Sequence, residues 1–221
     1  MQLKQHQLYT YNKILKHQKS FIFWPRQTGK SYILSHYLEQ FVNNNKDQDI
    51  LFISNNKRYF TIDRDRIMKN IGYLTIDKHR TENIYFINNN YLEFCSINQD
   101  FAYLFYQFKP SLIIYDEFHV DRTDRLTLVY NYITNNSPKC IFTSTFIDMD
   151  VIKLLDFNND WYINILPTSE MMGDQYLGQV DNYKEKFKLL SYKPDNLLDF
   201  FDVIYQRKKK LKLLNKISNE S

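Results

Sequence analysis

The chain has 221 residues, of which 43% are hydrophobic and 24% are charged. These proportions are ordinary for a globular protein and exclude a wholly disordered chain. The formal net charge is only +4, and six basic residues without an acid lie between Arg207 and Lys216. The basic character therefore belongs mainly to the end of the chain, and the length predicts one domain with a small appendage.

Cysteine content and hydropathy narrow the setting. The only two cysteines, Cys95 and Cys140, exclude a disulfide framework and a cysteine-only zinc site. Such sparse cysteine favours a reducing, cytosolic compartment. No run approaches the ~20 apolar residues of a membrane span, and the polar N-terminus has no secretory signal core, so we expect no membrane association.

The first half of the chain alternates between helical and strand patterns. Apolar residues at helical spacing over 8–15 predict a short helix, and the apolar run 21–24 before Pro25 predicts a buried strand. From Ser31 the spacing predicts a second helix to residue 41, and residues 50–53 predict the next strand. The mixed, highly charged stretch 55–82 predicts one or two helices.

The second half continues with apolar strands. Residues 84–87 and 91–95 predict a β-hairpin, because the intervening asparagines tolerate the positive φ of a tight turn. Further buried strands are predicted at 112–115, 140–144 and 161–166, with a helix over 127–133.

Fold class and domain limits follow from this order. Apolar strands without polar alternation, separated by helices, predict an α/β fold with a mostly parallel sheet and helices on both faces. After Pro167 the pattern changes to a loop and then to helices. We therefore divide the chain into a domain at 1–166 and a small C-terminal helical segment at 167–221.

The most informative motif is the octapeptide at 24–31, Trp-Pro-Arg-Gln-Thr-Gly-Lys-Ser. It lies between a predicted strand and a predicted helix, which is the context of a phosphate-binding P-loop. Gly29 allows close approach of the backbone, Lys30 would reach the β- and γ-phosphates, and Ser31 would ligate Mg²⁺. Trp24 departs from the motif, since it replaces the first glycine. A strand–turn–helix with a chance Gly-Lys-Ser is the alternative.

A pair of acids follows the strand at 112–115. A nucleotide site needs one carboxylate for Mg²⁺ and another to polarise the attacking water, at the C-terminal end of a strand beside the P-loop strand. Asp116 fits the first role and Glu117 the second; two solvated acids at a strand end are the alternative. The next strand ends in Thr143, Ser144 and Thr145, whose hydroxyls suit contacts to phosphate or to the catalytic carboxylate.

These three motifs together resemble the ATPase domain of the large terminase subunit, the motor that packages viral DNA, over about residues 5–150. The resemblance implies a RecA-like P-loop NTPase that binds ATP and Mg²⁺. It implies that Arg26 contacts the γ-phosphate, with Gln27, Thr28, Gly29, Lys30 and Ser31 completing the loop. It also implies base contact near Tyr11 and Asn12, where Asn12 replaces the glutamine of the family, and a coupling role for Thr143, Ser144 and Thr145.

The same resemblance implies the partners. These are double-stranded DNA, a homo-oligomeric ring, a capsid portal, and a small terminase subunit or separate nuclease, in the cytoplasm of an infected host cell. Arg122 and Arg125 are candidates for an arginine inserted into a neighbouring subunit's site, with a surface arginine as the alternative for each. The basic run 207–216 would contact DNA phosphates or would simply be a solvated helix face.

Two other functions are compatible with the motifs. One is the first RecA-like domain of a DExH-type helicase, which would use Asp116, Glu117 and residues 143–145 equally well. The other is a nucleotide-binding protein that does not hydrolyse its ligand. We expect no nuclease domain in this chain, because the residues after Thr145 are too few for one and carry no convincing set of metal-binding acids.

Overall fold

A computed structural model describes residues 3–24, 28–54, 64–69, 71, 76–81, 84–96, 105, 108–118, 123–145 and 161–165. The predicted segment 167–221, its basic run 207–216, and Arg26, Gln27 and Arg122 lie outside the described residues. None of the helices that the structure describes has the length and hydrophobicity needed to span a bilayer.

The described strands form one eight-stranded sheet in the order β3-β4-β5-β2-β6-β7-β1-β8. Six of them pair in parallel: β5 (Asn90–Ser96), β2 (Asp49–Ser54), β6 (Leu112–Asp116), β7 (Lys139–Ser144), β1 (Lys19–Phe23) and β8 (Trp161–Ile165). The predicted mostly parallel α/β sheet is confirmed. Its parallel strands bring all their C-terminal ends to one edge.

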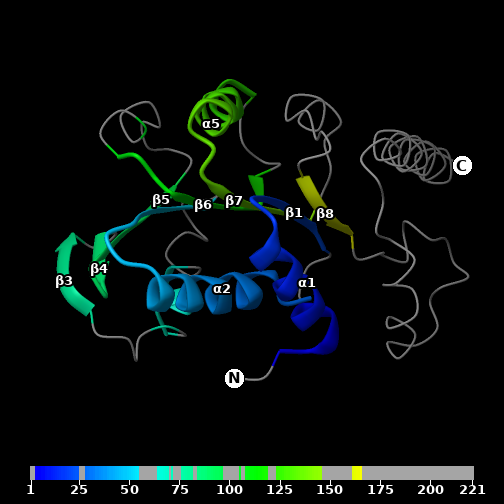
Figure 1. Cartoon of the computed structure of the whole chain (residues 1–221), viewed down its shortest axis with the longest axis horizontal. Coiled ribbons are helices and arrows are strands. Elements are labelled where there is room, and N and C mark those ends of the chain that lie inside the picture. Colours follow the sequence, from blue (N-terminus) through cyan, green and yellow to red (C-terminus); the bar gives the residue numbers. More distant parts are fainter. Residues whose placement is uncertain are drawn as a thin grey trace, which may run out of the picture.

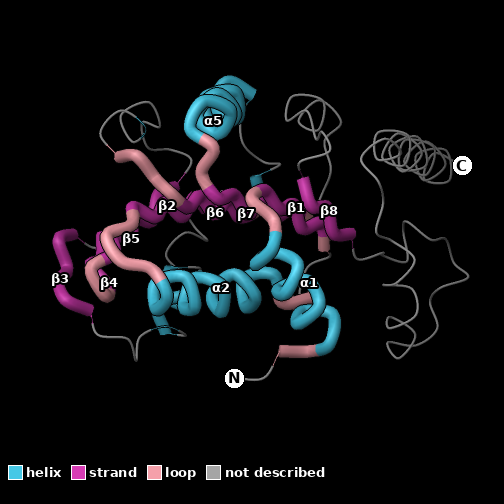
Figure 2. The backbone as a smooth tube through the Cα atoms, in the orientation of Figure 1, coloured by secondary structure: helices cyan, strands magenta, loops and turns pink. Residues whose placement is uncertain are grey.

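Helices cover both faces of this sheet (Figure 1). Helices α1 (Gln5–Lys16) and α2 (Lys30–Asn44) lie on one face, and α5 (Thr123–Asn136) lies on the other. Figure 2 shows the strands as a single row between these two helical layers. The chain thus buries the strands on both sides, as their continuous apolar sequences require.

Two hydrophobic clusters fill the space between the layers. Successive residues of β1 alternate between them: Phe21 and Phe23 pack with α5, while Ile22 and Trp24 pack with α1 and α2. Side chains of a strand point alternately to opposite faces, so this alternation places each residue's layer. Trp24 and Thr143 thereby face the α2 side at the C-terminal edge.

The antiparallel edge of the sheet corrects one prediction. The stretch 55–82 is predicted to be helical; residues 64–69 are, but Ile76–Thr81 forms edge strand β3, antiparallel to β4 (Ile84–Ile87). The charged sequence of β3 has no apolar alternation, and charge is common on edge strands. Backbone pairing with β4, which local sequence does not reveal, decides its conformation.

The predicted β-hairpin is confirmed. β4 and β5 pair antiparallel around Asn88 and Asn89, whose φ angles are 51° and 63°. Both are positive, as a two-residue hairpin turn of this kind requires, and asparagine supplies them without glycine.

Candidate functional site

The phosphate-loop motif lies between β1 and α2. Gly29 immediately precedes α2 and has φ 93°, a left-handed conformation that glycine adopts without strain. An added Cβ at Gly29 would lie 2.1 Å from Nε2 of Gln7, so both the backbone angle and the space require glycine. The helix therefore begins at Lys30 with its free N–H groups at the loop, where the helix dipole favours an anion.

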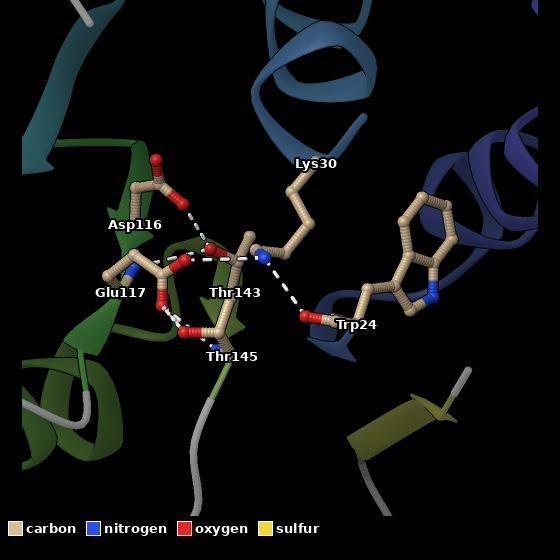
Figure 3. A network of polar contacts seen from close by, with 6 residues as sticks. All are labelled: Trp24, Lys30, Asp116, Glu117, Thr143 and Thr145. Atoms are coloured by element: carbon tan, nitrogen blue, oxygen red, sulfur yellow. Dashed lines mark hydrogen bonds and ion pairs between the residues drawn. The ribbon is translucent and has the colours of Figure 1, made fainter. Parts of the chain in front are cut away.

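Lys30 is buried at the head of this helix, with 6% of its side chain exposed. Its ammonium group donates to the backbone oxygen of Trp24 at 2.9 Å and lies 3.2 Å from Oε1 of Glu117. Figure 3 shows the side chain extending from α2 between these two acceptors. A buried ammonium needs such partners, because desolvation of an unpaired charge is costly.

The acidic pair lies at the end of β6, but not directly beside the P-loop strand as expected. β7 is inserted between β6 and β1. The distance is bridged by side chains: the hydroxyl of Thr143, on β7, donates to Asp116 Oδ1 and accepts from the backbone N–H of Glu117 at 3.3 Å. Thr143 is fully buried and so fixes both acids from the middle strand.

Glu117 is held at both of its carboxylate oxygens (Figure 3). Oε1 faces Lys30, and Oε2 accepts from the backbone N–H and the hydroxyl of Thr145 at 2.9 and 2.8 Å. Its backbone has φ 55°, in the left-handed region. Ser144 is fully buried, and its backbone oxygen accepts from the N–H of Trp24 at 3.1 Å. The end of β7 therefore contacts both the acidic pair and the loop.

Trp24 is anchored at its side chain as well. Its indole N–H donates to Oδ1 of Asn164 at 2.6 Å, and the hydroxyl of Thr10 donates to the same oxygen at 3.3 Å. The Asn164 amide N–H₂ donates to the Tyr162 hydroxyl at 3.0 Å. Burial raises the pKa of that hydroxyl, so Tyr162 stays protonated.

The residues expected to contact the base lie elsewhere. Tyr11 packs in the core against Tyr37 and His36 of α2, and Asn12 is exposed on the other side of α1. The α1 side chain that reaches the loop is Gln7, which is 5% exposed and donates to the backbone oxygen of Thr28 at 3.2 Å. Gln7 lies one turn before Tyr11, on the buried face that the helical period defines.

Sequence reasoning thus brings together Thr28, Gly29, Lys30, Asp116, Glu117, Thr143, Ser144 and Thr145, and it missed Gln7 and Asn164. The buried position of Gln7 on the α1 face was a readable signal. Asn164 carried none, because its role depends on β8 lying next to β1. Arg125 is half-buried on α5, on the opposite face of the sheet from α2.

Oxygen donors for a divalent cation are available in this site. The carboxylate of Asp116 and the hydroxyl of Ser31 are hard ligands of the kind that Mg²⁺ prefers. Among the described residues, no group of three or more His, Cys, Asp or Glu side chains could hold a metal ion. This set suits Mg²⁺, which usually takes one or two protein ligands together with water and substrate phosphates.

Comparisons with solved structures identify the fold. The structure matches the ATPase domain of the large terminase of Thermus phage P74-26, at 8% sequence identity over 86% of this chain and 94% of that one, with a TM-score of 0.57. It matches the large terminase of another thermophilic bacteriophage at 12% identity over 89% of this chain and 52% of that one, with a TM-score of 0.58. The N-terminal domain of the DNA packaging ATPase of bacteriophage phi29 matches at 16% identity over 72% and 95%, with a TM-score of 0.50.

The chain spans about half the length of the second of these, the large terminase of the thermophilic bacteriophage. That terminase has also been solved with ADP and with ATP-gamma-S. Searches with the sequence matched no protein-family model and no curated protein. The structure therefore identifies the fold as the RecA-like α/β fold of large-terminase ATPase domains.

Proposed function

We propose that this protein binds ATP with Mg²⁺ and hydrolyses it to move double-stranded DNA into a viral capsid. The observation that carries the proposal is the meeting of Lys30, Asp116 and Glu117 at the C-terminal edge of a parallel sheet, joined by Thr143. The shared fold with phage packaging ATPases supports the DNA-translocating form of this activity.

The loop residues would bind the triphosphate. Backbone N–H groups at 28–31, aided by Arg26 and Gln27, would face the phosphates, and Lys30 would offset their charge. In the present structure Lys30 is held by Trp24 and Glu117. A triphosphate carries more negative charge than these two partners, so we expect Lys30 to move toward it and release Glu117.

Glu117 would then act as the general base. Thr145 donates twice to Oε2, so Oε1 is the oxygen left to accept a proton from water once Lys30 has moved. Asp116 and Ser31 would hold Mg²⁺, which neutralises charge on the phosphate oxygens. Thr143, Ser144 and Thr145 would couple the state of the site to β7, because they contact both acids and Trp24.

The wider assembly is part of the same proposal. Residues 1–166 would form the motor domain and 167–221 a lid or linker. A homo-oligomeric ring would act on duplex DNA at a capsid portal in the host cytoplasm, with a small terminase subunit or a separate nuclease as further partners. Arg122 or Arg125 would serve a neighbouring subunit, and residues 207–216 would contact DNA.

Steady-state ATP hydrolysis tests the proposal. Wild type and Glu117→Gln are assayed with Mg²⁺, alone, with duplex DNA and with single-stranded DNA. We expect Glu117→Gln to lower kcat by about a hundredfold or more while ATP binding persists. Asp47→Asn is the matched control, since Asp47 is an exposed carboxylate with a similar φ of 56° outside the site.

The arms distinguish the alternatives. Turnover that duplex DNA stimulates supports the packaging motor. Stimulation by single strands alone would instead favour a helicase. A wild type that binds ATP without turnover in any arm would favour a nucleotide-binding protein, and unchanged turnover in Glu117→Gln would remove that residue from catalysis.

A further inference from the structure

Trp24 occupies the position where a phosphate loop ordinarily begins with glycine. A glycine there offers no side chain that the rest of the protein can hold. Trp24 is fully buried and fixed in three ways: its N–H donates to Ser144, its carbonyl accepts from Lys30, and its indole donates to Asn164. The start of this loop is therefore tied to β7, α2 and β8.

The contact with Asn164 is specific in its orientation. An indole N–H can only donate, so the amide oxygen of Asn164 must face it. The amide N–H₂ is then directed to the Tyr162 hydroxyl, and Thr10 supplies a second donor to the oxygen. Asn164 is 5% exposed, so a change that removes its oxygen leaves a buried indole N–H without this acceptor.

The same residue, Trp24, contacts both Asn164 and Lys30. Its side chain is held by Asn164 at 2.6 Å and its carbonyl receives the Lys30 ammonium at 2.9 Å. A carbonyl on a rigidly held residue gives Lys30 a fixed position at the head of α2. A loop that is already ordered loses less conformational entropy when it binds a ligand.

We propose that Asn164 is a positioning residue for the phosphate loop: through the Trp24 indole it holds the loop and its lysine ready for the triphosphate, and so raises the affinity for ATP. The inference rests on the proposed function, because it assumes that the loop binds ATP. It assigns to β8, which contributes no residue to the P-loop or the acidic pair, control over nucleotide affinity.

Equilibrium binding of a fluorescent ATP analogue to the full chain tests this inference. We expect Asn164→Leu to raise Kd about 5- to 20-fold, which corresponds to the loss of one buried hydrogen bond. Thr10→Val is the matched control, because it removes the other donor to the same oxygen without touching Trp24. If Asn164 acts through Trp24, Thr10→Val leaves Kd unchanged.

Trp24→Phe provides a second route that does not depend on Asn164→Leu folding. It removes the indole N–H, so Kd should rise, and Asn164→Leu in that background should add little further loss. In a Trp161→Phe background Trp24 is the sole tryptophan, and its emission should change when ATP displaces Lys30 from its carbonyl.

The outcomes separate this inference from the proposed function. If wild type binds no ATP analogue, both fail. If wild type binds but Asn164→Leu and Trp24→Phe bind equally well, the positioning role fails and the proposed function stands. Equal weakening by Thr10→Val and Asn164→Leu would also overturn it, since the effect would then be general loss of packing around β8.

Discussion

At the scale of the residue, Glu117 combines an unfavourable backbone with well-placed side-chain contacts. Its φ of 55° lies in the left-handed region, which costs a residue with a Cβ about 1–2 kcal/mol. Thr143 accepts its backbone N–H, and Thr145 donates twice to its carboxylate. These contacts hold the residue in the strained conformation, and strain of this kind is concentrated at functional sites.

This strain predicts a difference between two substitutions that both remove the carboxylate. Glu117→Gly relieves the backbone, whereas Glu117→Ala keeps the Cβ, so the glycine variant should be more stable by about 1 kcal/mol. Urea unfolding measures the difference. The control is the same pair at Asn131, exposed within α5, where alanine should be the more stable by about 0.5–1 kcal/mol. An alanine variant as stable as the glycine variant at position 117 would show that the backbone is not strained.

At the scale of the element, the β4–β5 hairpin supports the helix that begins at the loop. Asn90 is fully buried, and its amide N–H₂ donates to the backbone oxygens of Val42 and Asn45 at 3.1 and 2.8 Å. Asn88 donates to Val42 at 2.8 Å. The last carbonyls of a helix lack partners within it. The hairpin satisfies them at the C-terminal end of α2, while Lys30 stands at the other end.

Asn90→Ala should therefore destabilise the protein. The substitution removes the donor to these carbonyls and the acceptor for the Gln48 N–H at 3.1 Å, and we expect a loss of about 1–3 kcal/mol. Asn43→Ala is the control, because Asn43 is exposed on the same helix and should change stability by less than about 0.5 kcal/mol. Both are measured by urea unfolding. Equal effects of the two substitutions would mean that the hairpin does not cap α2.

At the scale of the whole molecule, the sequence predicts the layers better than the arrangement within them. Uninterrupted apolar strands separated by helices required a parallel sheet with two covered faces, and the strand-end rule placed Lys30 and Asp116 on one edge. Strand order is different, because no local pattern shows that β7 lies between β6 and β1. For the same reason the Trp24–Asn164 contact, which spans 140 residues, could not be anticipated.

Lys139 also joins distant parts of the chain, and its protonation predicts how global stability depends on pH. Its amine, on β7, donates to the backbone oxygens of Ile14 and His17 at the end of α1. Burial lowers the pKa of Lys139 to about 8. An unfolded lysine has a pKa of about 10.4, so between pH 8 and 10.4 the unfolded chain binds more protons and the free energy of unfolding rises with pH. The neutral amine still donates to both carbonyls, so the contacts survive deprotonation.

The comparison with Lys139→Met isolates this titration from that of every other group. Urea unfolding of both proteins at pH 7, 8, 9 and 10 gives the difference in free energy of unfolding, wild type minus variant. That difference should be constant below pH 8 and should increase toward pH 10, because only the wild type loses the penalty of a buried ammonium group. Lys46→Met, at an exposed position in the loop after α2, should leave the difference flat across the range. A flat difference for Lys139→Met as well would mean that Lys139 titrates as it does in the unfolded chain, and that its ammonium group is not desolvated against α1.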